Sequence, residues 1–166
     1  MASDASRLRP EAYPAFSFAV DPAVAPFPTD RPLIVFDGVC VLCSGFAKFV
    51  VRRDKRRRFL FTHAQSPLGA ALFRHYGLDP LEFETNIVII DGRAHGRLGA
   101  FAAVMGELGW PWRAFTIANF LPTRLADWLY DRIAKNRYRL FGLTGVCMLP
   151  DASWRERLIG DHATRD

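Results

Sequence analysis

The chain has 166 residues and a mass of 18.8 kDa, and it is 50% apolar and 23% charged. This balance is typical of one soluble domain with a full hydrophobic core and excludes disorder of the whole chain. The net charge of +5 is too modest to indicate a nucleic-acid or membrane partner by itself. The sequence shows neither an apolar stretch of membrane-spanning length nor a secretory signal pattern, so we expect a cytoplasmic location.

The chain has three cysteines, Cys40, Cys43 and Cys147. An odd and sparse count argues against a secreted scaffold held by disulfides. In a reducing compartment, a close pair such as Cys40 and Cys43 is more typical of redox chemistry or metal binding than of a structural bridge.

Residues 1–31 are rich in proline and show no sustained period of a strand or a helix. We therefore predict an extended arm ahead of the folded domain. The arm carries aromatic side chains that favour contact with the domain surface: Tyr13, Phe16, Phe18 and Phe27.

After residue 32 the pattern alternates between strands and helices. An apolar run that ends at Asp37-Gly38 is typical of a buried strand followed by a turn. The next apolar residues recur at helical spacing up to the basic run 52–58, where cations suit the end of a helix. Proline is well suited to the first turn of a helix, so Pro67 indicates a second start. The predicted elements are strand 33–36, helix 42–50, strand 59–62 and helix 67–76.

The second half of the pattern begins with two strands joined by the tight-turn pair Asp91-Gly92. Trp110-Pro111-Trp112 interrupts the following helical pattern, and Ser153-x-x-Glu156 has the form of a capping box. The predicted elements are strand 86–90, strand 93–95, helix 100–108, helix 123–135 and a short terminal helix after residue 152. This order predicts a small α/β layer fold whose first two strands are parallel. We expect one domain over residues 32–150 with a helical extension, then a short helix and tail over 151–166.

The motif Cys40-x-x-Cys43 lies between the first predicted strand and the helix that follows it. Side chains three apart in a first helical turn are neighbours and lie within disulfide range. The first cysteine then faces the positive end of the helix, which favours thiolate over thiol. Because the thiolate is the nucleophile in disulfide exchange, we expect Cys40 to attack and Cys43, one turn further and less exposed, to resolve.

Asp37 lies three residues before Cys40 and has two interpretations. It is either a turn or capping carboxylate, a common place for aspartate, or a partly buried base that accepts the proton of Cys43. The sequence leaves both open.

Asp37-x-x-Cys40-x-x-Cys43 after a strand resembles the signature of the DCC family of predicted thiol-disulfide oxidoreductases, and the resemblance spans about residues 32–150. Later blocks resemble the same family: Ala64-Gln65-Ser66, Asn136-Arg137-Tyr138-Arg139, Phe141-Gly142 and Cys147-Met148-Leu149-Pro150. The resemblance implies a thioredoxin-like three-layer α/β sandwich with a helical C-terminal extension. It also implies Asp37, Cys40 and Cys43 as the catalytic site, and we expect neither a cofactor nor a metal there.

Two positions differ from the pattern that the resemblance implies. The family commonly has Ser-x-Ala before its third helix, where this chain has Arg97-Leu98-Gly99-Ala100. Thioredoxin-like folds usually place a cis-proline before the strand that faces the cysteines, where this chain has Glu84-Thr85-Asn86.

We expect exchange with a protein or small-molecule thiol or disulfide, and the alternative is a redox-inert binding module. In that alternative Cys40, Cys43, Cys147 and His63 form a Cys3His zinc site, or the cysteines are structural. The zinc site is less favoured because only one Cys-x-x-Cys pair exists and an unliganded strand-end histidine is common. A phosphatase of the haloacid dehalogenase type is excluded, because Val39 occupies the place of the second aspartate that such sites need. The substrate, the electron donor and the oligomeric state are not fixed by the sequence.

The remaining motifs favour structural roles. We expect the basic run 52–58 to be a solvated helix end without specific nucleic-acid binding. We expect the aromatic residues Trp110, Trp112 and those of 115–130 to pack in the core rather than to contact a membrane surface. Cys147 is a buried inert thiol, a relay thiol or a zinc ligand, and the first is favoured because unpaired cysteines are usually buried.

Overall fold

The computed structural model describes residues 10–79, 85–142 and 155–160. Its centre is a four-stranded mixed sheet in the order β2-β1-β3-β4. The strands are β1 (Leu33–Phe36), β2 (Leu60–His63), β3 (Ile87–Ile90) and β4 (Arg93–Gly96). β1 is parallel to β2 and antiparallel to β3, and β3 and β4 form an antiparallel hairpin. The predicted parallel pairing of the first two strands is therefore confirmed.

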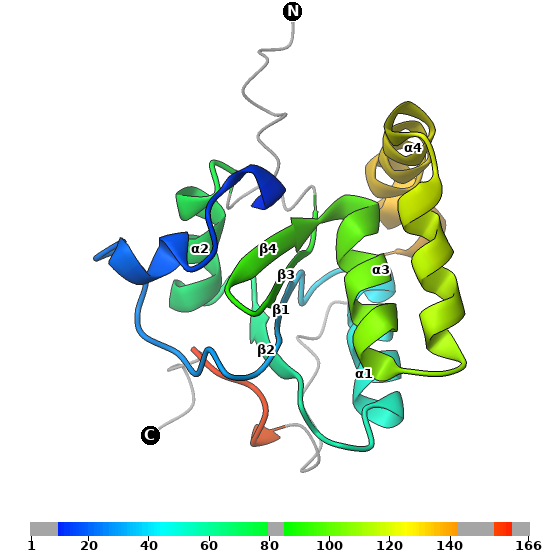
Figure 1. Cartoon of the computed structure of the whole chain (residues 1–166). Helices are drawn as coiled ribbons and strands as arrows, with labels where there is room; N and C mark the ends of the chain where they lie inside the picture. Colours follow the sequence, from blue (N-terminus) through cyan, green and yellow to red (C-terminus); the bar gives the residue numbers. More distant parts are fainter. Residues whose placement is uncertain (1–9, 80–84, 143–154, 161–166) are drawn as a thin grey trace, which may run out of the picture.

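Helices cover both faces of the sheet (Figure 1). α1 (Val41–Arg53) and α3 (Arg97–Leu108) lie on one face, and α2 (Pro67–His75) lies on the other. Alternate residues of β1 belong to the two cores, because side chains of a strand point to opposite faces. Leu33 and Val35 pack in the cluster with α2, while Ile34 and Phe36 pack in the cluster with α1 and α3. The predicted thioredoxin-like, three-layer α/β fold is confirmed.

The helical extension lies outside these three layers. The segment η4 (Trp112–Phe120) packs against α3, and α4 (Thr123–Phe141) contacts both α1 and α3. α4 runs six residues beyond the predicted 123–135. Among the described residues, no helix is both long and apolar enough to cross a membrane.

The prediction that the aromatic residues of this extension pack in the core is wrong for most of them. Trp112 does pack, edge to face on Phe49 with ring centroids 4.9 Å apart. Trp110, Phe120 and Trp128 are instead 84%, 86% and 61% exposed. The reason is geometric: an outer layer has one side on the domain, so the rest of its apolar residues have no core to enter.

The chain before β1 lies against the hairpin and α2. It forms two short 3-10 turns, η2 (Pro10–Ala12) and η3 (Ser17–Val20). Glu11 Oε1 accepts a 2.6 Å hydrogen bond from the N–H of Gly96 at the end of β4. His75 of α2 bonds to Ser17 Oγ through Nε2, at 2.9 Å, and to Asp21 through Nδ1, at 2.8 Å. These polar contacts fix the described part of this segment on the domain.

Residues 155–160 run beside the outer edge of β2. The N–H of Phe61 donates to the carbonyl of Arg157, and the N–H of Ile159 donates to the carbonyl of Phe61, both at 2.8 Å. Leu158 thereby makes a parallel bridge to Phe61. The predicted capping box begins at Ser153, outside the described residues, and the described residues after it pair with the sheet edge.

Tyr76 provides a test of this packing through pH. Its side chain is buried, its hydroxyl has no hydrogen-bond partner within the described ranges, and burial raises its pKa to about 12. In the folded state the Tyr76 hydroxyl therefore keeps its proton at a pH of about 10, where the hydroxyl of an unfolded tyrosine loses it. Stability should fall as the pH rises from about 10 towards 12, because only the unfolded state ionises readily there. Tyr76→Phe should be nearly neutral at pH 7 and reduce this alkaline loss, measured by urea unfolding at several pH values. An unchanged pH dependence in Tyr76→Phe would contradict the assignment.

Candidate active site

The candidate site lies where β1 ends, next to the end of its parallel partner β2. The apolar run of β1 stops at Asp37-Gly38, and α1 begins three residues later at Val41. β3 is antiparallel to β1, so Thr85, just before β3, is at the same edge of the sheet. Loops beyond the carboxyl ends of strands are common places for sites in α/β folds.

Asp37 is 2% exposed and accepts hydrogen bonds on both carboxylate oxygens. Oδ1 accepts from the N–H of Val39 at 3.0 Å and from Gln65 Nε2 at 2.7 Å. Oδ2 accepts from the hydroxyl of Tyr138, on α4, at 2.5 Å. The bond to Val39 is that of a turn carboxylate, whereas those to Gln65 and Tyr138 join Asp37 to the loop after β2 and to α4. Asp37 therefore connects three separate segments.

The backbone of Gly38 is held from three directions. Its N–H donates to Gln65 Oε1 at 3.2 Å, and its carbonyl accepts from Ser44 Oγ at 3.2 Å. A Cβ atom at Gly38 would lie only 2.9 Å from Cδ2 of His63, so the imidazole ring lies directly against this turn. Only glycine leaves room for the ring at this position. The turn before the cysteines is therefore tightly packed.

Cys40 and Cys43 occupy the first turn of α1 as thiols. Cys40 is the N-cap residue, with extended backbone angles, and its carbonyl accepts from the N–H of Ser44 at 2.9 Å. Cys43 is the third residue of the helix. The expectation that Cys43 is the less exposed of the two is wrong, because Cys40 is 0% and Cys43 is 5% exposed. The sequence pattern does not show that α4 packs against α1 and connects to Asp37 through Tyr138.

Comparison with known proteins now identifies the family. Residues 34–143, from β1 to just beyond α4, match the family of DCC1-like thiol-disulfide oxidoreductases. This chain belongs to that family. The matched region of this DCC1-like protein contains Asp37, both cysteines of the close pair and Tyr138.

Two relatives are similar to this chain over most of its length. The DCC1-like chain is 37% identical over 127 residues to an uncharacterized protein, YuxK, of Bacillus subtilis, which covers 76% of this chain and 93% of the relative. It is 35% identical over 121 residues to a chloroplastic DCC family protein of Arabidopsis thaliana, which covers 72% of this chain and 70% of the relative. No solved structure matches significantly.

The DCC1-like fold brings three further residues to the site: His63, which the sequence suggested only as a zinc ligand, and Gln65 and Tyr138, to which it gave no role at the site. His63 is buried at the end of β2, opposite Phe36 in the strand register, and packs edge to face on the Phe36 ring at 4.9 Å. Gln65 and Tyr138 hold Asp37 as described. Both lie in blocks that resemble the family, which was the available signal, but their contact with Asp37 could not be inferred from spacing.

The zinc alternative has no support among the described residues, where no group of three or more histidine, cysteine, aspartate or glutamate side chains is arranged to hold a metal. Cys147, one of the proposed ligands, lies outside the described residues. The structure therefore does not test its three predicted fates.

Thr85 occupies the place where a cis-proline is usual in thioredoxin-like folds. It is buried, and its Oγ1 accepts from the N–H of Arg97 at 2.8 Å and from the hydroxyl of Tyr130 at 3.2 Å. Thr85 thus connects the start of β3 to α3 and α4. A side-chain hydroxyl organises this edge of the site in the DCC1-like chain.

We expect Tyr138→Phe to loosen the packing of α4 on the Asp37 turn that precedes the cysteines. The change removes the hydroxyl that bonds to the buried Asp37 carboxylate but keeps the ring, and such a bond to a charged group contributes about 1.5–3 kcal/mol. Urea unfolding should show that loss, and alkylation of the native thiols should be faster. Tyr130→Phe is the matched control on the same helix, since its hydroxyl reaches a neutral acceptor, Thr85, and should cost only about 0.5–1.5 kcal/mol. Equal alkylation rates in wild type and Tyr138→Phe would contradict the role of Tyr138.

Proposed function

We propose that this protein exchanges dithiols and disulfides through Cys40 and Cys43. The observation that carries the proposal is the position of the pair: Cys40 caps α1 and Cys43 lies in its first turn, directly after the Asp37-Gly38 turn. The orphan N–H groups and dipole of a helix N-terminus stabilise a thiolate there. Membership in a family of thiol-disulfide oxidoreductases supports the same reaction.

The proposed reaction has two exchange steps. The Cys40 thiolate attacks one sulfur of a substrate disulfide, forming a mixed disulfide and releasing the other substrate sulfur as a thiolate. The Cys43 thiolate then attacks the Cys40 sulfur, which forms the Cys40–Cys43 disulfide and releases the second substrate thiolate. The substrate gains two electrons and two protons, and the protein loses them. A dithiol donor returns the protein to its reduced form by the reverse steps.

Asp37 has a supporting role in this scheme. Its carboxylate is held in one orientation by Gln65, Val39 and Tyr138 at the turn that leads into the cysteines. A buried carboxylate so placed suits the acceptance of the Cys43 proton before the second step. The imidazole ring of His63 lies against the same turn.

The burial of both thiols sets a condition on the substrate. Cys40 has no exposed surface, so a disulfide reaches its sulfur only after the surrounding residues move. A small-molecule disulfide needs less movement than a folded protein. The relative rates with a small disulfide and with a protein disulfide therefore test the substrate class.

The primary experiment is mild oxidation followed by differential alkylation and mass spectrometry. We expect a reversible Cys40–Cys43 disulfide, and a dominant bond to Cys147 or between chains would contradict the proposal. The reduction potential of the Cys40–Cys43 disulfide then shows whether the protein reduces or oxidises its substrate. A reductase has a potential of about −270 mV, and an oxidant has a much higher one. Metal analysis of the purified protein separates this function from the alternative, because stoichiometric zinc would favour a redox-inert binding module.

A further inference from the structure

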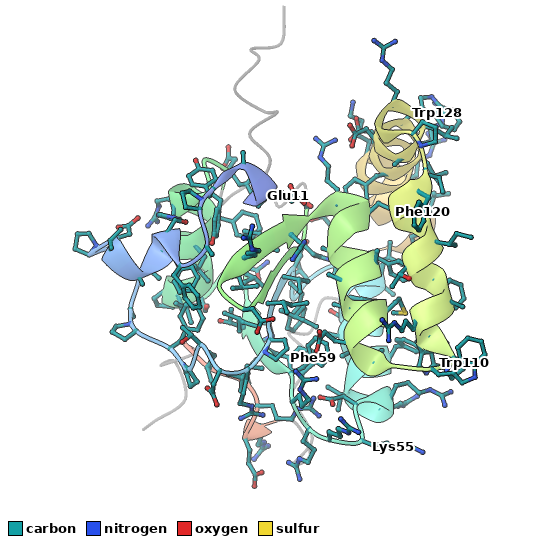
Figure 2. All side chains as sticks on the ribbon, viewed as in Figure 1. Glu11, Lys55, Phe59, Trp110, Phe120 and Trp128 are labelled. Carbon is teal, nitrogen blue, oxygen red and sulfur yellow. The ribbon has the colours of Figure 1, made fainter. Side chains whose placement is uncertain are left out.

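The surface formed by η4 and α4 exposes an unusual number of large apolar side chains. Of the 13 large hydrophobic residues that are exposed in the described ranges, ten lie between Trp110 and Phe141. In Figure 2, Trp110, Phe120 and Trp128 all lie on the side of the molecule formed by η4 and α4, and all three are exposed. A concentration of this kind on a single domain marks an interaction surface rather than the usual scatter of exposed apolar residues.

The exposed residues and the residues that hold the domain lie on opposite faces of α4. The inner face contacts the domain through Tyr138, which bonds to Asp37, and through Tyr130, which bonds to Thr85. Exposed residues recur three or four positions apart on the other face, at Leu125, Trp128 and Leu129, and continue to Arg132 and Ile133. The inner face of α4 therefore makes its hydrogen bonds with the domain. The apolar residues of its other face are left in solvent.

The charge on this surface is mainly positive. Residues 110–142 contain six basic and two acidic residues. Both acids, Asp127 and Asp131, face Arg97 of α3, with distances to its Nη1 of 3.6 and 3.3 Å. Arg132, Lys135 and Arg139 are exposed on α4, three or four residues apart, so they form a basic stripe along the helix. We use "outer face" for Trp110, Phe120, Trp128, Arg132, Lys135 and Arg139.

We propose that the outer face binds the surface of an anionic lipid bilayer. A helix with tryptophan, phenylalanine and leucine on one side, and with lysine and arginine beside them, is typical of helices that lie in the membrane interface. Tryptophan is favoured at that depth, and long basic side chains reach the headgroups while their stems lie against apolar surface. The cations are complementary to anionic headgroups.

A second copy of the chain fits this surface less well. A symmetric dimer through the outer face would bring Arg132, Lys135 and Arg139 of both copies together, and like charges in an interface are unfavourable. Nucleic acid fits less well too, because its phosphates and bases would pair with the basic and aromatic residues but not with the exposed aliphatic residues Leu125, Leu129 and Ile133. The bilayer surface accommodates both the apolar and the basic residues.

The test uses the full reduced chain and sedimentation with vesicles. We expect binding to vesicles of phosphatidylglycerol and phosphatidylcholine in equal parts, with a blue shift of tryptophan fluorescence, and much weaker binding to phosphatidylcholine alone. The triple variant Arg132→Gln/Lys135→Gln/Arg139→Gln should weaken binding by about tenfold or more. Phe120→Gln and Trp128→Gln should weaken it without changing thiol exchange, since neither residue belongs to the candidate site.

Two controls test whether vesicle binding depends on this surface or on any exposed cation or apolar residue of the chain. Arg52→Gln/Lys55→Gln/Arg56→Gln removes the same number of exposed cations from the last turn of α1 and the loop after it, and Val20→Gln removes an exposed apolar residue elsewhere. Both should bind vesicles as wild type does. An equal loss in the two triple variants would overturn the proposal, and so would a lack of binding to the anionic vesicles. A concentration-dependent dimer in sedimentation velocity that Trp128→Gln dissociates would also overturn it and assign the outer face to a second copy.

Discussion

Cys43→Ser is expected to trap a mixed disulfide on Cys40, whereas Cys40→Ser is expected to trap none and to leave disulfide exchange at the uncatalysed background. The reason is the order of the two steps: without Cys43 the first exchange still occurs but nothing resolves it. Without the thiolate at the helix N-terminus, the first exchange itself is lost. Intact-mass spectrometry after incubation with a small disulfide measures the adduct directly.

The controls for this result use the third cysteine and the reverse assignment. Cys147→Ser should keep most of the exchange activity and form no stable adduct, because the proposed reaction needs only the close pair. Cys43 is slightly more exposed than Cys40, so the alternative is that Cys43 attacks the substrate and Cys40 resolves the mixed disulfide. Trapping in Cys40→Ser but not in Cys43→Ser would establish those opposite roles. A loss of activity in Cys147→Ser as large as in Cys40→Ser would place Cys147 in the site.

The strands, the parallel pairing of β1 with β2 and the β3–β4 hairpin were predictable because their signals lie in the strands and in the connections between them, whereas the antiparallel pairing of β1 with β3 was not predicted. The run Leu33–Phe36 is apolar on both faces, as a strand buried between two helical layers requires. Asp91 and Gly92 have φ angles of 50° and 75°, the left-handed values that the tight turn of a hairpin needs and that this residue pair adopts readily. The Cys-x-x-Cys pair was likewise placed at the start of α1 from its neighbours alone.

The contacts around the cysteines were not predictable in the same way. Tyr138 is 101 residues from Asp37, and a spacing pattern carries no information on which side chains meet over such a separation. His63 reaches the Gly38 turn only because β2 pairs with β1 in a register that aligns it with Phe36. The apolar stripe at Leu125, Trp128 and Leu129 looks the same in sequence whether it faces a core or solvent. Only the position of α4 outside α1 and α3 decides between them.

Arg157 was equally hidden in the sequence, and its replacement is expected to have the largest effect on stability. Arg157 is 3% exposed, and its Nη2 donates to Asp54 Oδ2, whose side chain is 5% exposed. Arg157 Nε also donates to the carbonyl of Phe59 at 3.0 Å, and Asp54 Oδ2 accepts from the N–H of Phe59 at 2.9 Å. Burial lowers the pKa of the guanidinium, and the charge of Asp54 opposes that shift. The pair thus fastens residues 155–160 and the end of α1 to the start of β2.

Arg157→Met keeps most of the side-chain volume but leaves Asp54 buried without its charge partner, which costs about 3–5 kcal/mol. Against a typical total of about 5–15 kcal/mol, urea unfolding should show a large fall in stability or an unfolded protein. The double variant Asp54→Asn/Arg157→Met should recover part of the loss, because no uncompensated charge remains. Arg57→Gln is the matched control: Arg57 pairs with Glu156 at 3.0 Å, but these side chains are 55% and 77% exposed, so its loss should cost only about 0–1 kcal/mol. If Arg157→Met were as mild as Arg57→Gln, the buried pair would not be what holds the final segment to the sheet.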